Sequence, residues 1–150
     1  MWLDRPRRSE NNGGMSMNIT SLSSAMGAAI TGVDLSRDDS ATFDAVRRAL
    51  LDHHMVVVRG QDVPPVAHIA FSRRFGPVEA HDNTRYLKEG FPEILVLSND
   101  LVDGEPVGVP DAGDAWHSDL SFKKIPALVT ILFALRLPNQ GGDTDFSNLH

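Results

Sequence analysis

The stretch 40-SATFDAVRRALLDHHMVVVRGQD-62 decides the fold class, because its apolar pattern changes partway along. The first part begins at Ser40, a good helix N-cap, and places apolar residues from Phe43 onward at helical spacing, which predicts an α-helix. Residues 55–59 (MVVVR) are a β-branched run that Gly60 closes, which predicts a buried strand followed by a turn. The sequence therefore predicts helices and strands within one chain.

Segments on either side of this stretch extend the pattern. A second helix is predicted from Pro64-Pro65 to a stop at Gly76-Pro77, and residues 99–114, rich in Gly and Pro, predict a loop. Three further strands are predicted at residues 28–35 (AAITGVDL), 93–98 (EILVLS) and 127–135 (ALVTILFAL), the last with Phe133 and Leu135 in the core. Two early helices with mostly short strands after them predict an α+β fold with a β-rich core.

The first sixteen residues, MWLDRPRRSENNGGMS, differ from the rest of the chain. They are polar, with three arginines and an Asn-Asn-Gly-Gly cluster, and show neither a helix nor a strand period. We predict a disordered or misassigned extension at 1–16, with Met15 or Met17 as an alternative start to Met1. Residues 17–150 are then expected to belong to a single domain.

Composition restricts the classes of function. The chain has 150 residues, a net charge of −6 and no cysteine. The negative charge does not favour a nucleic acid or an anionic membrane as partner, and the lack of cysteine excludes disulfides and thiolate metal sites. Because no apolar run approaches the roughly 20 residues of a membrane span, we expect a cytoplasmic protein whose strong metal ligands are His, Asp and Glu.

The stretch DAWHSDLSF, residues 114–122, brings His117 and Asp119 close together in sequence. If it lies on a strand, side chains two positions apart point to one face, so both can reach one metal ion. A His and a carboxylate are two ligands of the facial triad that holds Fe(II) and leaves open positions. About one His-x-acid pattern is expected by chance in a chain of this composition, so a surface His-Asp pair is the alternative.

The surrounding sequence resembles a known family. WHSDLSF at 116–122, followed by GGDT at 141–144, is similar to the metal and cosubstrate segment of the Fe(II)/α-ketoglutarate-dependent dioxygenases of the taurine and phenoxyalkanoate (TauD/TfdA) family. Upstream segments fit in the same order, so the resemblance covers residues 17–150; they are GAAITGVDL (27–35), ALLDHHMVVVRGQ (49–61) and AFSRRFGPVEAH (70–81).

The resemblance implies a double-stranded β-helix (jelly roll, cupin-like) with flanking helices. It implies Fe(II), O2 and α-ketoglutarate as cosubstrate, with hydroxylation of a small organic anion and release of succinate and CO2. His117 and Asp119 match the first two iron ligands, Thr144 matches the threonine whose hydroxyl contacts a carboxylate of α-ketoglutarate, and His81 matches a histidine that holds the substrate's anionic group. Thr144 as a turn residue and His81 as a solvated loop residue are the alternatives.

Two positions depart from the taurine enzymes. Thr84 and Gly113 stand where those enzymes have a tyrosine and an asparagine, and Tyr86 replaces the tyrosine only if the loop has shifted. The substrate class is therefore left as taurine and other sulfonates or aryloxyalkanoates, with a lean to the latter. Homo-oligomer formation also stays open.

The family's second iron histidine and its cosubstrate arginine lie beyond residue 150, and the resemblance assigns no ligand role to His150. The chain therefore resembles the N-terminal portion of a catalytic domain, truncated at its C-terminal side. One hypothesis is a dioxygenase. The other is an inactive fragment or pseudo-enzyme that acts at most as a binding or assembly module. We expect little or no turnover from the 150-residue chain alone, and exposed apolar surface that favours association.

Overall fold

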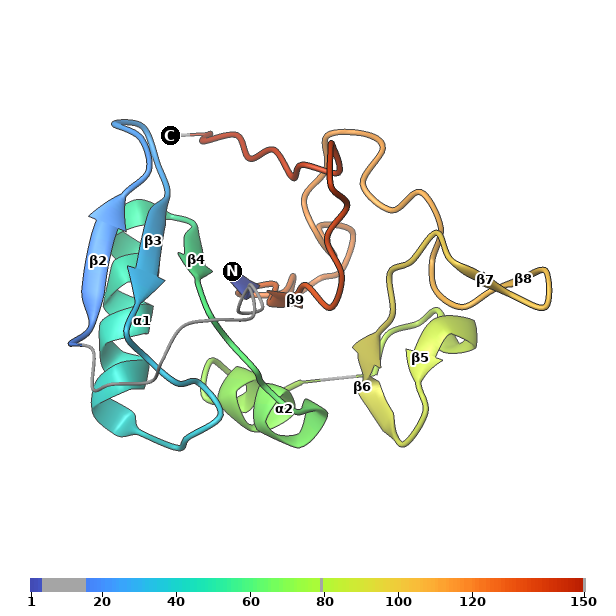
Figure 1. The fold of residues 1–150 in the computed structure, drawn as a ribbon, viewed down its shortest axis with the longest axis horizontal. Coiled ribbons are helices and arrows are strands. Elements are labelled where there is room, and N and C mark those ends of the chain that lie inside the picture. Colours follow the sequence, from blue (N-terminus) through green and yellow to red (C-terminus); the bar gives the residue numbers. More distant parts are fainter. Residues whose placement is uncertain (4–15, 79, 150) are drawn as a thin grey trace. The chain divides into compact units, whose positions relative to one another are not determined.

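The computed structural model describes residues 1–3, 16–78 and 80–149 (Figure 1). The chain divides into two compact units. The first unit is Met1–Val63 with Thr130–His150, and the second is Pro64–Val129.

A five-stranded sheet with the order β2-β3-β4-β1-β9 forms the centre of the first unit. Strands β2 and β3 pair antiparallel, and every other neighbouring pair in this sheet is parallel. The sheet therefore joins strands from the beginning, the middle and the end of the chain. Its members are β1 (Trp2–Leu3), β2 (Asn18–Ser21), β3 (Ala28–Thr31), β4 (Val56–Val58) and β9 (Leu132–Phe133).

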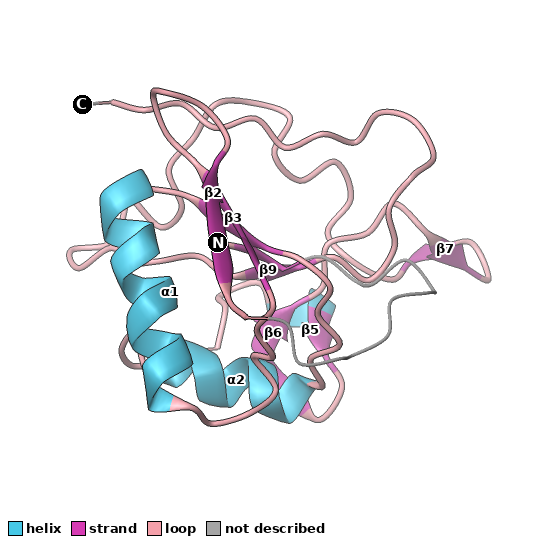
Figure 2. Cartoon of the chain, turned by 60° about the vertical axis from the view of Figure 1, so that its left-hand side comes forward, coloured by secondary structure: helices cyan, strands magenta, loops and turns pink. Residues whose placement is uncertain are grey.

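Helix α1 (Ser40–His53) lies along this sheet and contacts β3 and β4 (Figure 2). Phe43, Val46 and Ala49 are its buried residues, as the helical spacing predicts. The predicted cap is wrong by one residue, because the carboxylate of Asp39 accepts hydrogen bonds from the amides of the first turn. The helix ends where the backbone turns left-handed at the next residue, and β4 follows directly.

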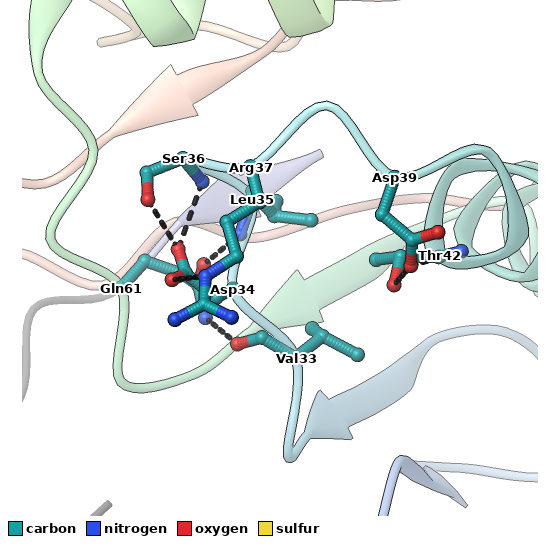
Figure 3. Close-up of polar contacts among 8 residues, drawn as sticks. All are labelled: Val33, Asp34, Leu35, Ser36, Arg37, Asp39, Thr42 and Gln61. Carbon is teal, nitrogen blue, oxygen red and sulfur yellow. Dashed lines mark hydrogen bonds and ion pairs between the residues drawn. The ribbon is translucent and has the colours of Figure 1, made fainter.

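Strand β4 confirms the prediction of a buried strand at 55–59, although it is shorter. Val56 and Val58 have no exposed surface, and Ala28 and Ile30 of the neighbouring β3 are equally buried. The turn after β4 delivers Gln61 into the same core, where its side chain binds the backbone of the segment after β3 (Figure 3). β-branched side chains on a strand that is covered on both faces account for this core.

The second unit begins with α2 (Pro65–Arg73), whose start at the second proline confirms the predicted helix. A short 3-10 helix η1 (Thr84–Tyr86) follows, and then two separate antiparallel pairs of strands. An ion pair of 2.7 Å between Arg73 and Glu93 connects α2 to β6. The strands are β5 (Leu87–Lys88), β6 (Phe91–Leu95), β7 (Leu101–Val102) and β8 (Glu105–Pro106).

The prediction of a core strand over 127–135 is wrong in extent. Only Leu132–Phe133 is strand, Leu128 is 84% exposed, and Leu135 is exposed as well. Within the described residues, β9 pairs with β1 through Trp2 opposite Leu132 and Leu3 opposite Phe133. Apart from β9, the described residues after β8 contain neither helix nor strand (Figure 1).

The structure places the first three residues of the predicted extension in the sheet, and the expectation for 1–16 as a whole stays a prediction. Met1 and Leu3 are buried, and β1 is a central strand of the sheet. Residues 4–15 of the predicted extension lie outside the described residues, and its last residue, Ser16, is described. The side chains of Met1 and Leu3 are apolar enough to join a core, which the polar average of residues 1–16 concealed.

Together these elements confirm the α+β class, with two early helices and mostly short strands after them. The strands form one five-stranded and two two-stranded sheets, and they do not themselves show a jelly roll. In the part of the chain that the structure describes, no helix is both long and apolar enough to cross a membrane.

Candidate metal site

His117 and Asp119 lie in the second unit, in a loop and not on the strand that we considered. A turn follows His117 directly, and Leu120 has a positive φ of 51°. The amide of Lys123 donates to the carbonyl of Leu120 at 3.0 Å. We expected the pleat of a strand to place the side chains of His117 and Asp119 on one face. That reason is wrong, because a turn brings the two side chains together.

The two side chains nevertheless meet. Nε2 of His117 lies 3.2 Å from Oδ1 of Asp119, and both side chains are about half exposed. The other ring nitrogen, Nδ1, lies 2.8 Å from the carbonyl oxygen of Ala115. Since a carbonyl only accepts, Nδ1 carries the proton in this contact, and Nε2 is the nitrogen directed at the carboxylate.

The surroundings of His117 favour its charged form. The Ala115 carbonyl, which accepts from the ring, contributes most to raising the pKa of His117 above its ordinary 6.5. The negative charge of Asp119 adds to the increase, and Asp114 adds less. Without a metal, a proton on Nε2 is therefore favoured in the position that faces Asp119.

This donor set fits a divalent metal ion. Two neighbouring ligands about 2.1 Å from one ion lie roughly 3 Å apart, close to the separation of Nε2 and Oδ1. Metal-binding histidines generally donate their second ring N–H to a carbonyl or carboxylate, as His117 does to Ala115. Imidazole with carboxylate is the ligand chemistry of non-haem Fe(II) sites. His117 and Asp119 thus supply two suitable donors.

Pairing between two segments of the second unit holds the loop that leads to this pair. Val109 donates to the carbonyl of Val96 at 2.9 Å, and its own carbonyl accepts from Ser98 at 3.2 Å. A Cβ on Gly108 would lie only 2.7 Å from the backbone nitrogen of Ser98. Glycine at 108 is therefore required for this close approach, and the pairing fixes where the chain begins its path toward His117.

His81 lies in the same unit and is partly buried. Its Nδ1 accepts a hydrogen bond of 3.0 Å from the amide of Asn83, so the ring bends back over its own loop. The next residue, Asp82, forms an ion pair of 3.4 Å with Lys123, four positions after Asp119. An ion pair thus connects the His81 loop to the His117–Asp119 segment.

Thr144 belongs to the first unit, so the structure describes it separately from His117, Asp119 and His81. It is exposed and lies in a segment without helix or strand. Gly141 and Gly142, which precede it, have φ near +70°, and a Cβ on Gly142 would lie 2.7 Å from Cγ of Pro138. The two glycines are therefore required by the turn, which sets the direction in which the chain approaches Thr144.

Within the described ranges, no three His, Asp or Glu side chains come close enough together to hold a metal ion. His117 and Asp119 stand as a pair, and His150 lies outside the described residues. Sequence reasoning missed Lys123 and Asp82, since their 41-residue separation leaves no local signal. It also missed the need for glycine at 108, although a glycine in an extended segment is a known sign of close backbone approach.

The chain is similar in sequence to known dioxygenases. Residues 18–150 match the family described as taurine catabolism dioxygenase TauD, TfdA family. Pentalenolactone F synthase of Streptomyces arenae is 32% identical over 139 residues, which cover 89% of this chain and 46% of that protein. The (S)-phenoxypropionate/α-ketoglutarate dioxygenase of Delftia acidovorans is 28% identical over 144 residues, with 89% and 47% covered.

A third curated relative and a solved structure are also similar to this chain. The α-ketoglutarate-dependent 2,4-dichlorophenoxyacetate dioxygenase of Cupriavidus pinatubonensis is 32% identical over 147 residues, covering 90% of this chain and 51% of that protein. A crystal structure of a taurine dioxygenase from Burkholderia xenovorans is 35% identical, covers 52% of this chain and 28% of that one, and has a TM-score of 0.46. The chain spans about half the length of the curated relatives it matches. Since the family match spans every residue after the first seventeen, this chain belongs to the taurine catabolism dioxygenase TauD/TfdA family.

Proposed function

We propose that this chain supplies the first two iron ligands of an Fe(II)- and α-ketoglutarate-dependent dioxygenase. The observation that carries the proposal is the contact of 3.2 Å between Nε2 of His117 and Oδ1 of Asp119, in a chain of this family. The relatives named above include two α-ketoglutarate-dependent dioxygenases, from Delftia acidovorans and Cupriavidus pinatubonensis. For the complete domain we propose the jelly roll that the resemblance implies.

Each residue has a chemical role in this proposal. The bound iron would supply the oxidising chemistry, with O2 as the oxidant. The cosubstrate α-ketoglutarate is converted to succinate and CO2. His117 presents Nε2 because the Ala115 carbonyl holds the opposite nitrogen, and Asp119 supplies the anionic oxygen beside it. Thr144 donates its hydroxyl to a carboxylate of α-ketoglutarate, and the exposure of Thr144 leaves that hydroxyl accessible.

For the substrate we propose a small organic anion that His81 helps to hold. Two of the relatives are phenoxyalkanoate dioxygenases, which supports the aryloxyalkanoate class. Thr84 and Gly113, in place of the taurine enzymes' tyrosine and asparagine, favour the same class over taurine. We expect aryloxyalkanoates to be better substrates than sulfonates and alkyl sulfates.

Metal binding tests the proposed ligands directly. Co(II), which resists oxidation in air, replaces Fe(II), and binding is followed by calorimetry and by its visible absorption. We expect His117→Ala and Asp119→Ala each to weaken binding at least about tenfold, and His53→Ala, a histidine on α1, to leave binding unchanged. Wild-type affinity in the His117→Ala variant would exclude the proposed site.

The same titration has an expected pH dependence. A proton and a metal ion compete for Nε2, and the pKa of His117 is raised above 6.5. Affinity should therefore fall as pH drops through that raised pKa, by roughly tenfold per unit well below it. Affinity that stays constant from pH 8 to pH 5 would show that His117 is not a ligand.

Turnover distinguishes the dioxygenase from the second candidate, an inactive fragment or pseudo-enzyme that acts as a binding module. The exposed Trp116 and Phe122 on either side of the ligand pair favour that second candidate, because apolar exposure on this scale is typical of contact surfaces. With two ligands of a three-ligand site, the 150-residue chain alone should form little or no succinate. Appreciable succinate from the chain alone, dependent on Fe(II) and O2, would contradict this expectation.

A chimera then tests whether the proposed ligands work. Residues 1–150 are fused to the second half of the Cupriavidus pinatubonensis relative, which this chain does not cover. We expect succinate formation with aryloxyalkanoates, lost in the His117→Ala chimera and kept in the His53→Ala chimera. A folded chimera that binds Co(II) but forms no succinate would favour the binding module.

Three expectations stay predictions. They are a cytoplasmic location, the lack of a nucleic acid or membrane partner, and homo-oligomer formation as an open alternative. Net charge and the small organic substrates named for the relatives are consistent with a protein that acts on small molecules.

A further inference from the structure

Two loops of the second unit carry the proposed iron ligands and the proposed substrate histidine. The His81 loop, residues 81–86, begins at His81 and ends with η1, and the metal loop, residues 109–123, contains His117 and Asp119. The two loops are separated in sequence by β5, β6 and the hairpin β7–β8. Contacts between them therefore decide where His81 lies relative to the metal pair.

Backbone hydrogen bonds join the two loops at one end. The carbonyl of Tyr86 accepts from the amide of Val96 at 2.9 Å, and the carbonyl of Val96 accepts from the amide of Val109 at 2.9 Å. An ion pair of 3.1 Å between Arg85 and Glu105 lies at the same end. Val96 thus holds the last residue of the His81 loop and the first residue of the metal loop.

A side-chain ion pair joins the loops at the other end. Nζ of Lys123, the last residue of the metal loop, lies 3.4 Å from Oδ2 of Asp82, which follows His81. The amide of Lys123 donates to the carbonyl of Leu120 at 3.0 Å, in the turn that comes directly after Asp119. Lys123 is thereby connected through the backbone to the metal pair and through its ammonium to the His81 loop.

The ion pair completes a closed circuit of contacts between the loops. One side of the circuit consists of main-chain hydrogen bonds, and the other depends on the ammonium of Lys123 and the carboxylate of Asp82. The imidazole of His81 follows its own backbone, because its Nδ1 accepts from the amide of Asn83 at 3.0 Å. Loss of the ion pair would leave the His81 loop held at its Tyr86 end.

The exposure of the pair indicates what kind of effect it has. The side chain of Asp82 is 68% exposed, and that of Lys123 is 28% exposed. An ion pair with so exposed a partner contributes little to folding stability and is weakened by salt. Its consequence is therefore the position of the loop, and the chain is expected to fold without it.

We propose that Lys123 and Asp82 are positioning residues, whose ion pair sets the separation between His81 and the His117–Asp119 pair. The inference rests on the proposed function, in which His81 holds the anionic group of the substrate. A substrate held at one end must present its reacting C–H bond to the metal site, and misplacement by about 1 Å is enough to impair such an arrangement. Lys123 thus acts on the substrate through Asp82 and His81.

A spin label measures the separation of the two loops without any metal. The chain has no cysteine, so a nitroxide on Ser121→Cys is attached at one place, within the metal loop. NMR measures the relaxation that the label causes at the His81 ring and the Asn83 amide, which falls steeply with distance. Lys123→Met removes the charge, Lys123→Arg keeps it, and Lys124→Met is the control at the neighbouring exposed lysine.

We expect Lys123→Met to lower the relaxation at His81 at least about twofold and to leave that at Val109, which the backbone holds, unchanged. Lys123→Arg and Lys124→Met should match the wild type. Exchange of the two charges, Asp82→Lys with Lys123→Asp, should restore at least about half of the lost relaxation. Unchanged relaxation at His81 in Lys123→Met, or an equal loss in Lys124→Met, would overturn the proposal.

A salt series on the labelled chain tests the ion pair without substituting either partner, so it covers a variant that does not fold. Because salt screens exposed charges, relaxation at His81 should fall in about 1 M NaCl toward the value of Lys123→Met. Relaxation at Val109 should stay constant. A wild-type His81 signal that does not respond to salt would count against the ion pair as the cause of the positioning.

Binding of a substrate-like anion separates this inference from the proposed function. Phenoxyacetate is the probe, and calorimetry measures its binding to the Co(II)-loaded chain. Lys123→Met should weaken phenoxyacetate binding at least about threefold with Co(II) affinity unchanged, and Lys124→Met should change neither. A wild type that binds neither Co(II) nor phenoxyacetate would contradict the proposed function, while the metal-free label measurement decides the positioning. A displaced His81 with unchanged phenoxyacetate affinity would overturn the positioning role.

Discussion

Gln61 connects the loops that follow two neighbouring strands of the first unit (Figure 3). Its Oε1 accepts from the amide of Leu35, and its Nε2 donates to the carbonyls of Val33 and Arg59, all at 2.9 Å. The residue is 1% exposed, so water cannot replace these bonds. A glutamine that the sequence places in a turn thereby fixes the path from β3 toward α1.

Substitution of Gln61 should destabilise the chain. Gln61→Ala leaves the buried amide of Leu35 without this acceptor, and Gln61→Glu opposes a carboxylate to two carbonyls, so each should cost about 1–3 kcal/mol of unfolding free energy. Urea denaturation followed by circular dichroism measures the cost. Gln140→Ala, at an exposed glutamine, is the control and should cost less than about 0.5 kcal/mol.

Asp34 should show a folding-linked titration. The Ser36 hydroxyl, 2.5 Å from its carboxylate, contributes most to lowering the pKa of Asp34 below 3.8, with further contributions from the Ser36 amide and the Arg37 charge. A lowered folded-state pKa contributes stability that is present above the unfolded value, about 3.9, and is lost as pH falls through the folded pKa.

Carboxyl-detected NMR titration measures this pKa. Ser36→Ala should raise the pKa of Asp34 toward 3.8, because it removes the hydroxyl donor, and Ser24→Ala should leave it unchanged. A pKa that does not move in Ser36→Ala would show that the hydroxyl is not the cause.

At the scale of elements, α1 begins one residue earlier than its apolar pattern indicates. Asp39 is extended, and its carboxylate accepts hydrogen bonds from the amides of Ala41 and Thr42. It also accepts a hydrogen bond from the Thr42 hydroxyl (Figure 3). Ser40 is already the first residue of the helix. Asp and Ser are both good N-caps, so the sequence alone did not choose between them.

The two candidate caps should differ in a denaturation experiment. Asp39→Ala removes the observed cap and should cost about 1 kcal/mol of unfolding free energy, with a range of roughly 0.5–2 kcal/mol. Ser40→Ala, in the first turn, should cost less than Asp39→Ala. The reverse order would restore Ser40 as the cap.

The hairpin β7–β8 shows a different limit of the sequence. Asp103 and Gly104 at its turn both have positive φ, 52° and 82°, and Asp-Gly is a strong signal of such two-residue turns. The Asp-Gly dipeptide lies in the segment that we predicted to be a loop. Because Gly and Pro are abundant around it, the sequence did not indicate that β7 and β8 pair there. Local turn chemistry was therefore more informative there than average composition.

At the scale of the whole molecule, the segment after the His117–Asp119 pair exposes large apolar side chains. Phe122, Ile125 and Leu128 are all more exposed than Trp116, which precedes the pair. This apolar segment, defined by Phe122, Ile125 and Leu128, lacks the regular backbone pairing that would bury alternate residues. Exposed apolar area on this scale favours association between molecules.

We therefore expect the isolated chain to self-associate. Sedimentation velocity should show oligomers whose fraction grows with concentration, and serine at Phe122, Ile125 and Leu128 together should reduce that fraction severalfold. Leu51→Ser, at a single exposed leucine of α1, should leave it unchanged. A wild-type monomer with a sharp cooperative melt would contradict this expectation.

Sequence by itself determined the family, the α+β class, both helices and the buried strand β4. These features depend on local period or on short motifs such as His-x-Asp, which neighbouring residues carry. Only the tertiary structure decided the place of Met1–Leu3 in the sheet, the burial of Gln61 and the ion pair of Asp82 with Lys123. Each of these joins residues far apart in sequence, where the pairing available in space and not the local pattern selects the partner.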